Sequence, residues 1–370
     1  MVLERETSMA QAFALILAGG SGTRFWPASR TTRPKQVLAI GPNAIDPLIA
    51  RTARRIEALC PADRAYIATG KSLVGVTREA LPWFPESSFL AEPLARNTAA
   101  CIGWASALIR RRDPEALIAA LPSDQVMDDE PGFRVAVQEA LKAAESGTIV
   151  TMGIKPNRPE TGYGYIEVGS ELSPGVCRVQ RFVEKPTREV AEGYLASGKY
   201  LWNAGMFFFR AQSMLDAIDQ HMPQLAEGIE RIEKAAKRGS EAEEAETLAV
   251  FQGLDSISID YGIMEKVKEL AVIPADVGWS DLGSWHTVWE LGKRDEQGNV
   301  APDSAVLVDA QNNLIENLRT VPGGKRVIAL VGVHDLCVVD TDDALLIIPR
   351  ERCQDVREIV AALKDRGDPV

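Results

Sequence analysis

This sequence of 370 residues lacks the residue patterns of several common kinds of site. Its five cysteines include no CxxC pair, and its three histidines show no metal-ligand spacing. The cysteines stand at positions 60, 101, 177, 337 and 353, and the histidines at 221, 286 and 334. We therefore expect reduced thiols in the core and no zinc site.

Long apolar runs and a broad spread of positive charge are missing too. No apolar segment approaches the ~20 residues that span a bilayer. The N-terminus, MVLERETSMA, has acids where a signal peptide has a basic and then an apolar stretch. We expect a cytoplasmic protein without a membrane partner. The formal net charge of −11 argues against a nucleic-acid partner, because such surfaces need spread cations.

Acidic residues are absent from one segment near the N-terminus. Between residues 9 and 45 the only charged side chains are those of Arg24, Arg30, Arg33 and Lys35. The cations follow an apolar run and a glycine loop, LILAGGSGTRFWP. A basic loop within an acidic protein suits a small anionic ligand that is drawn to one cleft.

The glycine loop fits neither of two common nucleotide-binding motifs. A dinucleotide fold needs G-x-G-x-x-G running directly into a helix, whereas here the spacing is G-G-x-G and Pro27 follows. A Walker A loop needs a Lys directly after its last glycine, and none is present. From these residues alone, two interpretations remain open. Backbone N–H groups at Gly19, Gly20 and Gly22 bind phosphates, or the loop is a tight turn with solvated cations.

Strand patterns alternate with helix patterns in the first 154 residues. Strands are expected at 13–20, 66–70, 116–124 and 148–154, and helices at 46–60, 97–111 and 133–147. This alternation predicts a Rossmann-like α/β domain with a mixed, mostly parallel sheet flanked by helices, and ligands outside the carboxyl ends of the strands.

The middle and the end of the chain have other textures. We interpret residues 160–209, with short strands and glycine turns, as an insertion that forms one wall of a cleft. Residues 227–246 are rich in Glu, Lys, Arg and Ala, which is typical of a solvated helical face. A linker-like segment places the domain boundary near residue 298, with domains 1–298 and 299–370. Short strand patterns and a helix pattern at 353–365 follow the boundary.

Eight segments, in order along the chain, resemble the sugar-nucleotide pyrophosphorylases, and most closely the mannose-1-phosphate guanylyltransferases. They are LAGGSGTRFWPASR…PKQ at 17–36, EPLARNTAA at 92–100, LPSD at 121–124, ETGYGYI at 160–166, FVEKP at 182–186, WNAGMFFF at 202–209, SIDYGIMEK at 258–266 and GWSDLGSW at 278–285. One departure is Gln125, which stands where relatives usually have His after the Asp of LPSD.

The resemblance implies that a sugar 1-phosphate oxygen attacks the α-phosphorus of a nucleoside triphosphate and releases pyrophosphate. Lys35 is then expected at the α-phosphate, and Arg24 at the leaving β- and γ-phosphates. Asp124 and Asp281 are expected to hold Mg²⁺, which binds few carboxylates besides phosphates and water. For each acid taken alone, a helix N-cap or a turn is the alternative interpretation.

The resemblance also implies the contacts to both substrates. The expected nucleotide contacts are Ala18, Gly19, Gly20, Gly22, Thr23, Glu92, Arg96, Asn97 and Ser123. As a hypothesis, Glu92 accepts from N1–H and the 2-amino group of guanine, and backbone groups of 18–20 are the alternative reader. Arg96 and Asn97 are expected near the ribose or as part of the loop structure.

The sugar-phosphate contacts are expected at Gly164, Glu184, Lys185 and Asn203. Glu184 would accept from sugar hydroxyls, Lys185 would pair with the 1-phosphate, and Asn203 would donate and accept. Gly164 would let the sugar lie against the backbone. A solvated strand end is the alternative for the Glu-Lys pair.

The expected reaction joins GTP and mannose 1-phosphate into GDP-mannose and pyrophosphate. The alternatives are a pyrophosphorylase for another sugar 1-phosphate or nucleotide, and a non-catalytic regulatory subunit. The C-terminal region resembles the left-handed β-helix-like appendage of relatives, which implies a homodimer, although an independent β domain is also open. Longer relatives carry an isomerase domain with metal-binding histidines. Three histidines are too few for it, so we expect no isomerase activity.

Overall fold

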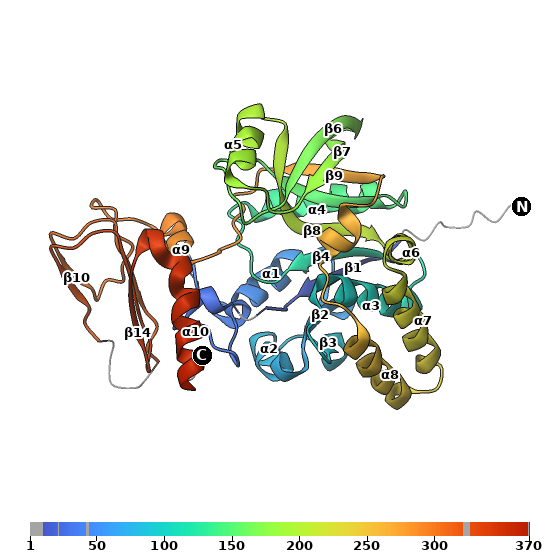
Figure 1. The fold of residues 1–370 in the computed structure, drawn as a ribbon, viewed down its shortest axis with the longest axis horizontal. Coiled ribbons are helices and arrows are strands. Elements are labelled where there is room, and N and C mark those ends of the chain that lie inside the picture. Colours follow the sequence, from blue (N-terminus) through green and yellow to red (C-terminus); the bar gives the residue numbers. More distant parts are fainter. Residues whose placement is uncertain (1–9, 21, 42–43, 321–325, 369) are drawn as a thin grey trace, which may run out of the picture.

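The N-terminal region is built on one nine-stranded sheet with helices on both faces (Figure 1). The computed structural model describes residues 10–20, 22–41, 44–320, 326–368 and 370. The strands are β1 (Ala12–Leu17), β2 (Ala65–Gly70), β3 (Phe89–Glu92), β4 (Leu117–Pro122), β5 (Ile149–Ile154), β6 (Tyr165–Ser173), β7 (Val176–Val183), β8 (Tyr200–Arg210) and β9 (Leu270–Ala275). Their order in the sheet is β3-β2-β1-β4-β8-β5-β9-β7-β6.

The first four strands are parallel, as their alternation with helices predicts. β1 lies between β2 and β4, and Leu17 at its end is level with Ala68 and Pro122. The carboxyl ends of these strands therefore meet at one edge of the sheet. The glycine loop after β1 and the Ser123–Asp124 turn after β4 leave the sheet side by side at this edge.

β8 differs from the sequence-based interpretation. It runs antiparallel between β4 and β5 in the centre of the sheet, whereas its residues were interpreted as part of an insertion that forms one wall of a cleft. The reason is the fully apolar run Phe207–Phe209, which is buried from both faces. The first half of β8 also pairs with β6, so one strand joins the central sheet to the outlying β6, β7 and α5 (Arg188–Ser197) (Figure 1).

Helices cover the sheet through three apolar cores. One core contains residues of α3 (Asn97–Arg112), α6 (Ala211–His221), α7 (Pro223–Ala236) and α8 (Ser240–Gly253), and another contains residues of α4 (Glu130–Ala144). A third packs α1 (Leu48–Ile56) and α2 (Val74–Ala80) against β1 and β2. The polar segment 227–246 forms parts of α7 and α8, as expected. Within the described ranges, no helix has the length and apolar character needed to cross a membrane.

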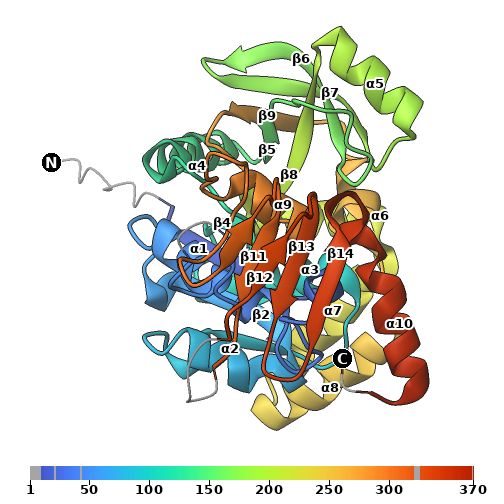
Figure 2. The same ribbon diagram turned by 90° about the vertical axis from the view of Figure 1, so that its left-hand side faces the viewer.

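The C-terminal region consists of short strands that stack as coils. They are β10 (Val306–Val308), β11 (Leu314–Asn317), β12 (Ala329–Val331), β13 (Leu336–Asp340) and β14 (Leu345–Pro349), preceded by α9 (Trp285–Leu291) and followed by α10 (Val356–Arg366) (Figure 2). Val306 pairs in parallel with Ala329, and Leu314 with Cys337, at the same offset along the chain. Parallel pairs at a constant offset without a crossover helix are typical of a β-helix, and β14 closes the stack antiparallel to β13.

This region packs directly on the basic loop. Phe25 shares one buried core with Cys337, Val356 and other residues of the C-terminal region, and its ring meets Trp285 edge-on at a centroid distance of 5.0 Å. Arg30 forms an ion pair of 2.7 Å with Asp343, which follows β13. Arg30 therefore holds the two regions together, and only part of the basic loop is left for a ligand.

Candidate active site

The glycine loop is held open by contacts to its carbonyl groups. Gln36 Nε2 donates to the carbonyl of Ala18 at 2.7 Å, and Ser29 Oγ donates to that of Gly22 at 2.8 Å. Among the described residues, the N–H groups of Gly19, Gly20 and Gly22 donate to no carbonyl. Ser21 lies outside the described residues. Within its described residues the loop thus presents N–H donors without a partner, the arrangement that binds phosphate groups.

Gly22 brings the loop against the segment that carries Lys35. Its φ of 58° lies in the left-handed region, and a Cβ at this position would lie 2.4 Å from Lys35 Cβ and 2.8 Å from Lys35 N. Any side chain would therefore force the loop and the lysine apart. The glycine that the sequence suggests for phosphate access is also required for the position of the lysine.

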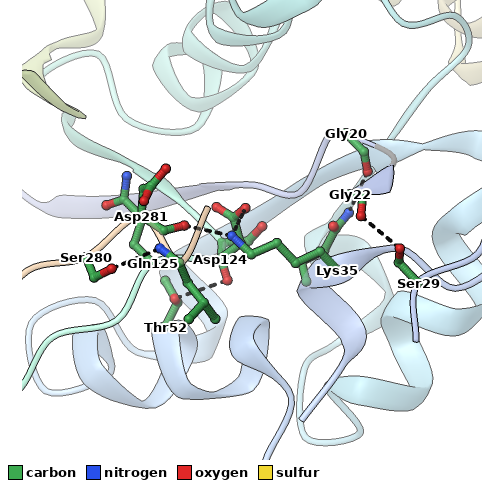
Figure 3. Close-up of polar contacts among 12 residues, drawn as sticks. Gly20, Gly22, Ser29, Lys35, Thr52, Asp124, Gln125, Ser280 and Asp281 are labelled. Carbon is green, nitrogen blue, oxygen red and sulfur yellow. Dashed lines mark hydrogen bonds and ion pairs between the residues drawn. The ribbon is translucent and has the colours of Figure 1, made fainter. Parts of the chain in front are cut away.

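Lys35 joins the two predicted metal acids (Figure 3). Its Nζ forms an ion pair of 2.9 Å with Asp124 Oδ2 and donates at 2.8 Å to the backbone carbonyl of Asp281. The Lys35 side chain is only 7% exposed, whereas that of Asp124 is 36% exposed. Two acids that are far apart in the sequence thus both contact one ammonium group, Asp124 through its carboxylate and Asp281 through its backbone carbonyl.

The Asp281 carboxylate is held by a group that the sequence did not single out. The hydroxyl of Tyr163 donates to Asp281 Oδ1 at 2.6 Å. Burial and the charge of Asp281 raise the pKa of Tyr163 well above its usual value, so this hydroxyl stays protonated. Asp281 is therefore fixed through its main chain by Lys35 and through its side chain by Tyr163.

Arg24 is a cation of the loop that is available for a ligand. It is half-buried in the short turn Thr23–Phe25, and it forms no hydrogen bond or ion pair with any described residue. Arg30, by contrast, is committed to Asp343. An unpaired guanidinium beside unpaired N–H groups makes this corner of the sheet strongly favourable for polyanions.

The predicted base reader, Glu92, is buried at the end of β3. Burial raises its pKa to about 7, and the thiol of Cys101 in α3 hydrogen-bonds to it. The position is at the same sheet edge as the glycine loop, two strands away. Contact with a purine stays a prediction for this residue.

Arg96 and Asn97 have backbone partners. Arg96 donates to the carbonyls of Phe251 and Gln252 at 2.6 and 2.9 Å, which ties it to the end of α8. Asn97 has a φ of 63°, and its Oδ1 accepts from the N–H of Thr98. Of the two roles expected for this pair, the geometry favours ordering the loop.

Ser123 lies next to the glycine loop. Its N–H donates to the carbonyl of Leu17, and its own carbonyl accepts from Thr52 Oγ1. These contacts fix the turn that ends in Asp124. The backbone of Ser123 therefore sets the direction in which Asp124 leaves the sheet.

The four predicted sugar residues lie together. The carbonyl of Gly164 accepts from Asn203 N at 2.8 Å, and a Cβ at Gly164 would lie 2.6 Å from Glu184 Oε2. That oxygen is buried without a hydrogen-bond partner among the described residues, while Lys185 pairs with the other carboxylate oxygen. An orphaned buried carboxylate oxygen needs a donor, and a ligand hydroxyl would supply one.

Asn203 is more constrained than expected. Its Oδ1 already accepts from Gly205 N and Thr151 Oγ1, and its Nδ2 donates to Asp260 Oδ1 at 2.9 Å. Only one amide hydrogen remains for a ligand. The expectation that Asn203 both donates and accepts is therefore corrected, because the folding of β8 uses its acceptor.

Two protein-family models match the N-terminal and the C-terminal regions of the chain. The family model of nucleotidyl transferases matches residues 13–298, and a model described as a MannoseP isomerase/GMP-like beta-helix domain matches 303–363. The chain belongs to the nucleotidyl transferase family. Its β-helix-like C-terminal region is confirmed by the second model, in line with the coil geometry.

Named relatives support the resemblance seen in the sequence. This nucleotidyl transferase is 37% identical over 355 residues to a mannose-1-phosphate guanylyltransferase of Klebsiella pneumoniae, covering 95% of this chain and 73% of the relative. It is 39% identical over 360 residues to the xanthan biosynthesis protein XanB of Xanthomonas campestris pv. campestris, covering 97% and 74%. The resemblance to the mannose-1-phosphate guanylyltransferases is thereby confirmed.

A solved structure supports the fold. The crystal structure of a mannose-1-phosphate geranyltransferase from Thermus thermophilus matches with a TM-score of 0.85 and 32% identity, covering 96% of this chain and 99% of that one. The α/β domain and its C-terminal appendage are therefore shared across nearly the whole length of this nucleotidyl transferase.

Two residues at the site of this nucleotidyl transferase were not predicted. Tyr163 belongs to the quoted segment ETGYGYI, and Asp260 to SIDYGIMEK. Asp260 accepts a hydrogen bond from Asn203 and lies near Glu184, and burial raises the pKa of Asp260 to about 6. The resemblance identified both segments, but nothing in the sequence distinguished Tyr163 or Asp260 from the neighbouring residues of its segment.

Proposed function

We propose that this protein makes GDP-mannose and pyrophosphate from GTP and mannose 1-phosphate. The observation that carries the proposal is the cluster of Lys35, Asp124 and Asp281 beside a glycine loop with unpaired N–H groups. This arrangement neutralises two polyanions at one point, which is the main requirement of phosphoryl and nucleotidyl transfer. A relative that matches nearly the whole of this chain carries the corresponding name.

The positions of the cations suggest their roles. Lys35 pairs with the Asp124 carboxylate in the structure. We propose that it exchanges this partner for the α-phosphate, whose oxygens are also anionic acceptors. Arg24 has no protein partner within the described residues and is assigned to the leaving β- and γ-phosphates. The loop N–H groups bind the triphosphate, with Gly19, Gly20 and Gly22 leaving the approach clear.

The two acids fit a hard divalent cation such as Mg²⁺. No group of three or more His, Cys, Asp or Glu side chains suited to a metal ion occurs in the described part of the chain, so the protein offers no complete cage. Asp124 and Asp281 would supply carboxylate oxygens to the ion, and substrate phosphates and water would supply its remaining ligands. Bound there, the ion would neutralise charge on the phosphates.

The sugar site is assigned to the group around Glu184. Its orphaned Oε2 accepts a hydroxyl, Lys185 pairs with the 1-phosphate, and Asn203 donates its remaining amide hydrogen. Tyr163 contacts Asp281, and the next residue, Gly164, belongs to the sugar group, so the Tyr163–Gly164 backbone connects the proposed sugar site with the metal acids. The sugar phosphate therefore lies next to the metal acids, where its oxygen can attack the α-phosphorus.

A matrix assay tests this function. Pyrophosphate release, coupled to inorganic pyrophosphatase and phosphate detection with Mg²⁺, is measured for four nucleoside triphosphates against several sugar 1-phosphates. The highest kcat/KM is expected for GTP with mannose 1-phosphate. A different best pair would redirect the substrates. Absence of release with every pair would favour the regulatory subunit instead.

Guanine selection is assigned to Glu92. Replacing it by Gln removes an acceptor that N1–H and the 2-amino group of guanine require, so the preference for GTP over ATP is expected to fall. An unchanged preference would move base reading to the backbone of residues 18–20. The variant Cys101→Ala is the control, because it removes the thiol that contacts Glu92 and leaves the carboxylate.

We also propose a cytoplasmic homodimer, assembled through the C-terminal region. Val306, Val308 and Val331 are each at least half exposed and share one face of the β10–β12 sheet. A second copy would cover this face, because contiguous exposed valines are unfavourable in water. Light scattering after size exclusion should give twice the chain mass for the wild type and a monomer for Val308→Asp. A wild-type monomer at micromolar concentration would contradict the dimer.

A further inference from the structure

Tyr163 contacts the metal acid Asp281 through its hydroxyl and the rings of Trp202 and Trp279 through its own ring. Its hydroxyl donates to Asp281 Oδ1 at 2.6 Å. Its ring meets Trp202 and Trp279 edge-on, at centroid distances of 5.2 and 5.3 Å. The tyrosine is thus fixed by packing on two sides, and its hydroxyl has one fixed direction.

Trp279 is fixed in turn by a polar side chain. Its Nε1 donates at 2.9 Å to Gln125 Oε1, while Gln125 Nε2 donates at 2.7 Å to the carbonyl of Ala204 in β8. Gln125 directly follows Asp124 in the chain. A chain of contacts therefore runs from Gln125, the neighbour of Asp124, through Trp279 and Tyr163 to Asp281.

The contact leaves part of Asp281 available. Its Oδ1 is occupied by Tyr163 and its backbone carbonyl by Lys35, while Oδ2 accepts no hydrogen bond from the described residues. A neutral donor on one oxygen restricts the rotation of the carboxylate without cancelling its charge. A carboxylate held in this way loses little conformational freedom when it binds a cation.

We propose that Tyr163 is a positioning residue that orients the Asp281 carboxylate for a divalent cation shared with Asp124. The inference rests on the proposed metal site and extends it to a residue that does not itself touch the ion. Loss of an outer hydrogen bond of this kind typically weakens metal affinity about 10- to 100-fold. The hydroxyl, and not the ring, is the active part.

The test measures Mn²⁺ binding to the full chain saturated with a non-hydrolysable GTP analogue, by electron paramagnetic resonance of the ion, because the proposed metal site needs phosphates to complete it and to release Lys35 from Asp124. Tyr163→Phe keeps the ring and its packing, and removes only the hydroxyl. Tyr165→Phe is the matched control, since this buried tyrosine lies two residues away in the same apolar core and makes no hydrogen bond to Asp281. Asp281→Asn serves as the reference for loss of a direct ligand.

Tyr163→Phe is expected to weaken Mn²⁺ binding about 10- to 100-fold, with Tyr165→Phe within twofold of the wild type. The Mg²⁺ concentration that half-saturates pyrophosphate release should rise by a similar factor, while kcat at saturating Mg²⁺ largely recovers. A merely structural defect would lower the thermal unfolding temperature and would not be rescued by Mg²⁺.

The outcomes separate the inference from the proposed function. Wild-type Mn²⁺ affinity in Tyr163→Phe, together with weak binding in Asp281→Asn, would overturn the role of Tyr163 alone. Wild-type affinity in both variants, or no Mn²⁺ binding in the wild type, would overturn the metal site and the inference with it. The matrix assay of substrates would still decide the reaction independently.

Discussion

Replacement of Lys35 by methionine is expected to remove most of the activity while the protein remains folded. The ammonium is almost fully buried and makes two short contacts, to Asp124 at 2.9 Å and to the carbonyl of Asp281 at 2.8 Å. Loss of one preorganised charge at a transferring phosphate typically costs about 10²- to 10³-fold in kcat, which is about 3–4 kcal/mol.

The cost in folding stability should be smaller than the cost in catalysis. Asp124 is 36% exposed, so water can solvate its carboxylate once the lysine is gone, and methionine fills most of the volume of the lysine stem. One carbonyl, that of Asp281, loses its donor, and we expect a loss of about 1–3 kcal/mol in the free energy of unfolding. Urea unfolding and steady-state pyrophosphate release measure the two quantities separately.

Two further variants control this prediction. Arg33→Met removes an exposed cation of the same loop and should leave kcat/KM within about twofold of the wild type, as expected for a solvated surface charge. Lys35→Arg keeps the charge but not the size, and should recover little activity in so enclosed a position. If Lys35→Met retained kcat within threefold of the wild type, the assigned role of the lysine would be wrong.

Three other predictions concern the loop, the base site and the domain contact. Gly22→Ala places a Cβ 2.4 Å from Lys35 Cβ at a φ of 58°, so it should lower the unfolding free energy in urea by at least ~1 kcal/mol, whereas Gly19→Ala, with open space around it, should not. Burial raises the pKa of Glu92 from 4.5 to about 7, so its ionisation costs stability as the pH rises through that range. Glu92→Gln should therefore gain about 1–3 kcal/mol relative to the wild type at pH 8 but not at pH 4, and an equal difference at both values would contradict the burial argument. Phe25→Ala should cost about 3–5 kcal/mol and lower activity, because Phe25 packs the basic loop on Trp285, and full activity at wild-type stability would show that the loop does not depend on this contact.

Much of the site could be predicted because its parts follow strand ends. The apolar strands around residues 13–17 and 116–122 were expected in one parallel sheet and are neighbours in the structure, and the glycine loop and Asp124 directly follow them in the chain. A residue that directly follows a parallel strand can be assigned to the ligand site from local sequence, because ligands bind at the carboxyl ends of such strands. Lys35 and Asp281 required the resemblance, because neither follows a strand of the parallel half of the sheet.

The remaining features depend on contacts that no local pattern encodes. β8 enters the central sheet because of its burial from both faces, and its glycines and short apolar runs were equally compatible with an outlying strand. Arg96 was expected either near the ribose or as part of the loop structure, and only the position of the end of α8 shows that its guanidinium donates to two carbonyls there. Tyr163 gains its importance only from Asp281, 118 residues away.

The proposed metal site can be tested most directly by locating Mn²⁺, from its anomalous scattering, in crystals grown with GTP. We expect one strong peak within coordination distance of carboxylate oxygens of both Asp124 and Asp281, with Lys35 Nζ released from Asp124 to the α-phosphate. A triphosphate bound at the glycine loop with Mn²⁺ distant from both acids, and Lys35 still on Asp124, would contradict the proposed metal site.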